Sequence, residues 1–223
     1  MQDLIAQERF EIEVLDKLNS GKFLSRLVFG GGTMLRLCHG LDRFSVDMDF
    51  WVRKDSYYEN LFQDLKEYLA QFYSLKDSME KFYTILFELK SPEYPRSLKL
   101  EIRKKKDVFA TEHAIAYSQY AYRQVYVRAI SLKDMLASKI DAFLTRKEIR
   151  DVYDIEFLLK RGIPLEAKDE KTMQIIKLID SLTKRDYTVK LSSLLEERQR
   201  KYYVAENFKI LKGALYQKLR EAQ

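Results

Sequence analysis

The run of three glycines at positions 30–32 is the feature that most constrains the fold of this chain. The 223-residue sequence contains only seven glycines, so three in a row indicate a local backbone requirement. They follow the apolar segment 27–29 and precede Met34, Leu35 and Leu37, which have helical spacing. We therefore expect a strand over 27–29 that turns sharply into a helix.

Such a turn has two interpretations. A helix that opens at Gly31-Gly32-Thr33 presents its first backbone N–H groups to solvent, where they can bind a phosphate. Alternatively, the glycines serve only a tight strand-to-helix connection. The residues that follow the turn decide between these interpretations.

Two carboxylates follow the turn within an apolar segment. Asp47 and Asp49 lie in the predicted strand 46–52, where alternation places both on the same face. Paired carboxylates bind the metal ions of phosphoryl-transfer sites. Glu101, in the predicted strand 98–103, is a candidate third acid that could complete metal coordination or accept a proton. Alternatively, Glu101 pairs with Lys99 or Arg103 on a solvated edge strand.

The order of predicted elements indicates an α/β fold with a mixed sheet, followed by helices only. The first half contains predicted helices at 3–19 and 57–73, a helix after the glycines, and strands at 27–29, 46–52, 83–89 and 98–103. The second half contains predicted helices at 131–144, 150–159, 170–183, 188–199 and 204–220. We expect an α/β core over residues 1–129 and a helical domain over 130–223.

Composition restricts the class of protein. The net charge of +6 mildly favours a polyanionic partner. Cys38 is the only cysteine, so no internal disulfide can form, and its apolar surroundings predict a buried helix residue. The sequence has neither a signal-peptide pattern nor an apolar run of membrane-spanning length. We therefore expect a cytoplasmic protein.

Two separated blocks resemble a known family. Gly31-Gly32-Thr33 followed by Arg43-x-Ser45-x-Asp47-x-Asp49-Phe50 is similar to the nucleotidyltransferase signature of the AbiEii/AbiGii abortive-infection toxins. The segment 131–155, which bears Lys139 and then Arg150-Asp151-x-x-Asp154, resembles the late helical motif of that family. The resemblance covers about residues 25–160.

The resemblance implies a polymerase-beta-like nucleotidyltransferase core and a role for each motif residue. Gly31, Gly32 and Thr33 would hold a nucleoside triphosphate, while Arg43 and Ser45 would orient the acid-bearing strand or contact the nucleotide. Asp47, Asp49 and Glu101 would bind Mg²⁺ or Mn²⁺. Lys139 would face the triphosphate, and Asp151 or Asp154 would fix that lysine or the substrate.

The late motif also has a structural interpretation. Arg146, Arg150 and Asp154 are spaced four residues apart on one helical face, which is typical of a solvent-facing ion ladder. Asp151 would then be a helix-start residue near the positive end of the helix dipole.

By the same resemblance, the protein is a toxin with a cognate antitoxin, and some family members add nucleotides to the 3′ end of transfer RNA. Residues 96–106 carry six positive side chains against Glu101, which favours an RNA acceptor. Tyr117, Tyr120, Tyr122 and Tyr126 lie in a segment that we expect to be flexible, and they could stack on bases or pack half-buried. Other open alternatives are transfer to a protein or small molecule, and a non-catalytic nucleotide- or partner-binding domain.

Overall fold

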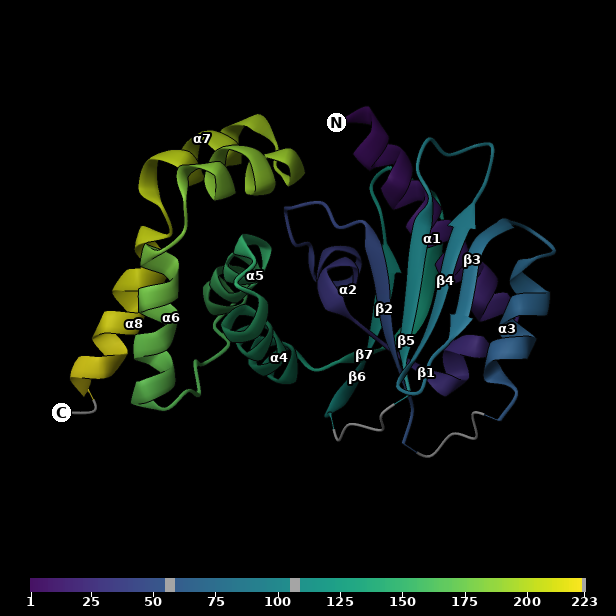
Figure 1. The fold of residues 1–223 in the computed structure, drawn as a ribbon, viewed down its shortest axis with the longest axis horizontal. Helices are drawn as coiled ribbons and strands as arrows, with labels where there is room; N and C mark the ends of the chain where they lie inside the picture. The colour runs from purple at the N-terminus through teal and green to yellow at the C-terminus, as the bar shows by residue number, and fades with distance from the viewer. Residues whose placement is uncertain (55–58, 105–108, 222–223) are drawn as a thin grey trace. The chain divides into compact units, whose positions relative to one another are not determined.

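The chain forms two compact units, Met1–Ser131 and Leu132–Gln223. The computed structural model describes residues 1–54, 59–104 and 109–221 (Figure 1). Two predicted segments extend outside these ranges. They are the helix predicted over 57–73, by its first two residues, and the basic segment 96–106, by its last two.

The first unit is built on a seven-stranded mixed sheet with the order β3-β4-β5-β2-β1-β7-β6. The pair β1–β2 is antiparallel, whereas β2–β5 and β1–β7 are parallel, so the predicted α/β class with a mixed sheet is confirmed. Its elements are α1 (Gln2–Ser20), a 3-10 turn (Phe23–Arg26), β1 (Leu27–Gly30), α2 (Gly31–His39), β2 (Asp47–Val52), α3 (Leu61–Leu69), β3 (Ser74–Glu80), β4 (Thr84–Lys90), β5 (Leu98–Arg103), β6 (Thr111–Tyr117) and β7 (Gln124–Ile130).

One face of this sheet is apolar and carries the helices. Phe29 and Phe50 are in register on this face, and their rings stack 4.8 Å apart. Phe62 of α3 stacks on Phe87 of β4 at 5.5 Å. Helix α1 also lies against the sheet, in contact with β5 and β7 (Figure 1). The opposite face is therefore the one that carries Asp47 and Asp49, because side chains alternate along β2.

Three strands of the sheet were not predicted. Strand β3 is an edge strand with mostly polar or exposed side chains, so it lacks the apolar alternation of an inner strand. Strands β6 and β7 form an antiparallel hairpin, so the stretch holding Tyr117 and Tyr126 is regular structure. Helix α3 is shorter than predicted and ends at Leu69.

The second unit contains only helices, as predicted, but with different limits. It comprises α4 (Leu132–Arg146), α5 (Ile149–Lys160), α6 (Asp169–Asp180), a π-helix (Asp186–Leu191), a 3-10 turn (Ser192–Leu194), α7 (Glu197–Glu206) and α8 (Lys209–Glu221). The helix predicted over 188–199 is broken, because the π-helix and 3-10 turn end before α7 begins. Asn207 and Phe208 have positive φ angles of 47° and 57°, which interrupt the helix predicted over 204–220.

Candidate active site

The glycine turn lies directly against three predicted site residues. Gly31 has a φ of +76°, and a Cβ atom on it would lie 2.2 Å from Asp49 Oδ2. A Cβ atom on Gly32 would lie 2.6 Å from Arg43 Nη2 and 2.9 Å from Ser45 Oγ. Any larger residue at either position would displace these side chains. The glycines are therefore required by close approach to Asp49, Arg43 and Ser45, and not by turn geometry alone.

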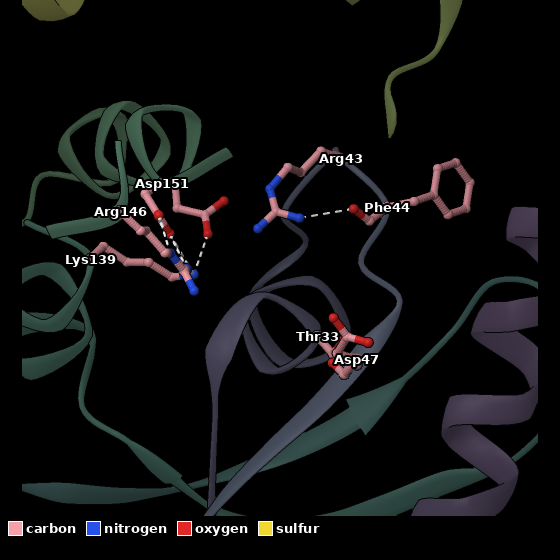
Figure 2. A network of polar contacts seen from close by, with 8 residues as sticks. Thr33, Arg43, Phe44, Asp47, Lys139, Arg146 and Asp151 are labelled. Atoms are coloured by element: carbon pink, nitrogen blue, oxygen red, sulfur yellow. Dashed lines mark hydrogen bonds and ion pairs between the residues drawn. The ribbon is translucent and has the colours of Figure 1, made fainter. Parts of the chain in front are cut away.

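The acid-bearing strand is fixed to the first turn of α2. Asp47 and Asp49 are half-buried on one face of β2, with the fully buried Met48 between them on the other face. The buried Thr33 donates a hydrogen bond from Oγ1 to the backbone carbonyl of Asp47 at 2.6 Å, and Figure 2 shows the two residues side by side. Thr33 therefore positions the acid strand, and its predicted contact with a nucleotide remains a prediction.

Glu101 lies next to Asp49. Strands β2 and β5 run parallel, and their register places Asp49 beside Glu101 and Asp47 beside Lys99 on the same face. Because β5 lies between β4 and β2, the alternative interpretation of Glu101 on an edge strand is wrong. The ion pair expected from that alternative is nevertheless present, since Arg103 Nε lies 3.3 Å from Glu101 Oε1. Glu101 is therefore an inner-strand acid that is paired with a cation.

The chemistry of these donors suits a hard divalent cation. Mg²⁺ is usually held by one or two carboxylates together with substrate phosphate oxygens, and Asp47 and Asp49 supply such a pair. Within the described ranges, no three His, Cys, Asp or Glu side chains lie close enough together to hold a metal ion. The pair on β2 therefore fits the predicted ion, and Glu101 lies beside Asp49 with its Oε1 paired to Arg103.

Arg43 is a buried cation in the loop before β2. It is 2% exposed, and its Nη1 donates a hydrogen bond to the carbonyl oxygen of Phe44 at 2.9 Å (Figure 2). Together with the close approach of Gly32, this contact fixes the loop that leads into the acid strand. These contacts favour a role for Arg43 in orienting the acid-bearing strand over a direct contact with the nucleotide.

Helix α1 contributes a buried acidic pair that the sequence analysis missed. Glu8 forms an ion pair with Arg36 of α2 and accepts a hydrogen bond from Ser118 Oγ at 2.6 Å. Glu11 is fully buried, and neither carboxylate oxygen has a hydrogen-bond partner among the residues described. Burial and the nearby Glu8 carboxylate raise the pKa of Glu11 well above its ordinary value. The sequence already indicates this burial, because Glu8 and Glu11 share helical spacing with Leu4 and Leu15 and so lie on the apolar face of α1.

In the second unit, α4 and α5 form a buried ion network. Lys139 Nζ lies 2.6 Å from Asp154 Oδ2 and 3.6 Å from Asp151 Oδ1. Arg146 binds Asp151 with two hydrogen bonds, Nε to Oδ2 at 2.7 Å and Nη2 to Oδ1 at 2.6 Å. Figure 2 shows Lys139 and Arg146 converging on Asp151. Both aspartates are 0% exposed, so two cations neutralise two buried carboxylates.

This network corrects one interpretation of the late motif. The solvent-facing ladder of Arg146, Arg150 and Asp154 is wrong, because Asp154 is buried and bound by Lys139. Arg146 instead binds Asp151, and the sequence analysis did not assign it to the site. In the sequence, Arg146 lies five residues before Asp151. The turn between α4 and α5 brings the two side chains together, which the spacing alone does not indicate.

The predicted site residues thus form two groups. The first unit brings together Gly31, Gly32, Thr33, Arg43, Ser45, Asp47, Asp49 and Glu101. The second unit brings together Lys139, Asp151 and Asp154 with Arg146. Each group combines charged side chains with well-defined partners.

Comparison with known families identifies the chain. The model of the nucleotidyl transferase AbiEii toxin family, of type IV toxin–antitoxin systems, matches residues 13–218. The chain belongs to the AbiEii family. It is therefore a nucleotidyltransferase of a toxin–antitoxin family, and the match extends beyond both sequence blocks to the C-terminal helices.

Two solved structures from Helicobacter pylori share the fold of this AbiEii protein. JHP933 is 21% identical with a TM-score of 0.57, and the match covers 96% of each chain. A candidate nucleotidyltransferase is 20% identical with a TM-score of 0.55, and the match covers 94% of this chain and 96% of the other. A search of curated proteins found no match. Among the described helices, none is sufficiently long and apolar to span a membrane.

Proposed function

We propose that this AbiEii protein transfers a nucleoside monophosphate from a nucleoside triphosphate to an RNA hydroxyl, with the 3′ end of transfer RNA as the acceptor. The observation that carries the proposal is the contact of the glycine turn with Asp49, which in turn lies beside Glu101. A turn suited to phosphate binding thereby meets a carboxylate pair where β1 and α2 join, beside β2.

The proposal gives each group of the first unit a role. The backbone N–H groups of the first turn of α2, which includes Gly31, Gly32 and Thr33, bind the triphosphate. Asp47 and Asp49 hold Mg²⁺ or Mn²⁺, which when bound neutralises charge on the phosphates. Glu101 accepts the proton from the attacking hydroxyl. Arg43 and Ser45 keep the acid strand in place, because both lie against Gly32.

The second unit supplies a cation in this proposal. Lys139 binds the triphosphate as a point charge, and Asp154 orients its ammonium group through the 2.6 Å contact. Asp151 is fully buried and bound by Arg146, so its role in the proposal is to position Lys139 and not to touch substrate.

Charge supports a nucleic-acid acceptor. The chain carries 40 basic and 34 acidic residues, and its isoelectric point is about 9.1. Within the segment 96–106, Arg96 and Lys99 are exposed, whereas Arg103 and Lys104 pair with Glu101 and Glu80. The exposed cations supply the sequence-independent attraction for phosphate that RNA binding requires. The family also implies a cognate antitoxin as a protein partner.

The test is transfer of label from each of four α-labelled nucleoside triphosphates. We expect label in transfer RNA from total RNA, loss of transfer with a chelator, and recovery with Mg²⁺ or Mn²⁺. Asp49→Asn should abolish transfer, while Asp42→Asn, an exposed acid in the preceding loop, is the matched control. Label in protein or in a small molecule, and none in RNA, would contradict the RNA acceptor. Equal toxicity of Asp49→Asn and the parent chain would favour a non-catalytic domain.

A further inference from the structure

The β6–β7 hairpin exposes a row of aromatic and apolar side chains on one face. Register places Ile115 opposite Tyr126 and Tyr117 opposite Gln124. Ile115, Tyr117 and Tyr126 are 52%, 55% and 61% exposed, although they lie in regular strands. Single exposed apolar side chains are ordinary, but several adjacent ones on one hairpin face form a patch of the kind that marks an interaction site.

The opposite face of the same hairpin is an ordinary core face. Ala116, Val125, Val127 and Ala129 are buried there, each at 2% exposure or less. The hairpin is therefore held mainly by this buried face, and the exposed row contributes little to the core of the first unit. Substitutions in the exposed row should leave the fold intact.

The exposed row lies on the face of the sheet that carries the acids. Gly30 is in register with Asp49, and a Cβ atom on Gly30 would meet the side chains of Trp51 and Ile130. Ile130 thus shares the acid-bearing face, and Tyr126 shares it too because it lies four residues earlier on the same strand. One sheet within one unit therefore carries both the catalytic acids and the aromatic row.

The chemistry of the row favours a nucleic acid. His113 stacks on Tyr126 with ring centroids 4.9 Å apart and an interplanar angle of 29°. Arg128 lies opposite His113. The eight residues of this face contain no carboxylate: Thr111, His113, Ile115 and Tyr117 on β6, and Gln124, Tyr126, Arg128 and Ile130 on β7. Flat rings beside cations bind successive unpaired bases and their phosphates.

We propose that this row, His113, Ile115, Tyr117, Tyr126 and Arg128, is a stacking surface for the unpaired 3′ end of the acceptor RNA. The proposal rests on the proposed function, because it specifies how the RNA acceptor is held. Stacking on Tyr126 and Tyr117 binds bases without reading their sequence, and Arg128 attracts the adjoining phosphates. Single-stranded RNA is the class of ligand, since a duplex keeps its bases stacked on one another.

The test measures binding of a short single-stranded RNA that contains 2-aminopurine, whose fluorescence is quenched by stacking. Tyr126→Ala and Tyr117→Ala should each weaken binding about tenfold, and Tyr126→Ala should also reduce the quenching. Tyr126→Phe keeps the ring and should bind like the parent. Tyr216→Ala is the matched control, because Tyr216 is 48% exposed on α8 in the other unit.

Transfer assays separate this proposal from the proposed function. Tyr126→Ala should raise KM for RNA without raising KM for the nucleoside triphosphate, whereas Asp49→Asn should abolish transfer and still bind the oligonucleotide. If RNA accepts label and Tyr126→Ala and Tyr117→Ala bind it as the parent does, the stacking surface is wrong and the function stands. If RNA neither binds nor accepts label, both fail. Loss of antitoxin binding by Tyr126→Ala with unchanged RNA binding would also overturn the proposal, in favour of a protein interface.

Discussion

The carboxylate of Asp49 occupies the space that a side chain on Gly31 would need. A Cβ atom on Gly31 would lie 2.2 Å from Asp49 Oδ2 and 2.9 Å from Asp49 Cβ, and the φ angle of Gly31 is +76°. The glycine turn and the acid strand therefore cannot vary independently.

Gly31→Ala should reduce nucleotidyl transfer about 100-fold, because the new methyl group displaces the carboxylate of Asp49, a metal ligand in the proposed function. Gly162→Ala is the matched control, since Gly162 also has a positive φ of +79° but nothing lies within 4 Å of its added Cβ. Both variants should lose about 1 kcal/mol of unfolding free energy, because alanine disfavours the left-handed backbone conformation that glycine adopts at both positions. Only Gly31→Ala should lose activity. Steady-state kinetics and urea unfolding make the comparison. Equal activity of the two variants would contradict the contact with Asp49.

Lys139→Met should destabilise the second unit by about 3 kcal/mol, because it leaves Asp154 and Asp151 buried with one cation fewer. The matched control is Lys171→Met, which breaks the exposed ion pair with Asp141 and should cost about 0.5 kcal/mol. Urea unfolding measures both changes. If the two variants unfold at the same urea concentration, the network is not the buried, mutually dependent structure described above.

Glu11→Gln should stabilise the protein, and the gain should grow as the pH rises from 5 to 8. In the unfolded chain Glu11 ionises near its ordinary pKa of about 4.3. Burial, followed by the Glu8 carboxylate, raises the pKa of Glu11 in the folded state. Above the unfolded pKa, the folded state therefore keeps a proton that the unfolded state releases, so stability falls with rising pH.

Glutamine does not ionise, so the free energy of unfolding of the Glu11→Gln variant should not show this decrease with rising pH. Thermal unfolding of parent and variant across the pH range measures the difference. Glu93→Gln, at an exposed position, should change stability little at any pH. A gain from Glu11→Gln that is the same at pH 5 and pH 8 would show that Glu11 is not held neutral.

The single thiol should resist alkylation in the folded protein. Burial, together with the Glu112 carboxylate, raises the pKa of Cys38 to about 12, so at pH 8 almost no thiolate is present. Iodoacetamide should therefore label the folded chain much more slowly than the chain in urea, as followed by mass spectrometry. Rapid labelling of the native protein would show that α2 opens or that the thiol is accessible.

Local sequence patterns predicted the strand-turn-helix and the acid strand, because apolar alternation and glycine placement act within a few residues. They could not predict β3, which has little apolar alternation and is fixed by its pairing with β4. The register of Asp49 with Glu101 also depends on pairing between strands separated by a helix and two other strands. The pattern at α4 and α5 permitted two interpretations, and burial of Asp154 decided between them.

The position of β1 has a consequence for synthesis on the ribosome. This strand leads into the glycine turn and lies between β2 and β7, and its parallel partner in β7 is Ala129, one hundred positions after Phe29. Contacts this distant in sequence form late, since the intervening chain must first exist and then close. A nascent chain that ends before β7 leaves β1 as an open edge. The seven-stranded sheet can therefore be completed only after more than half of the polypeptide has been translated.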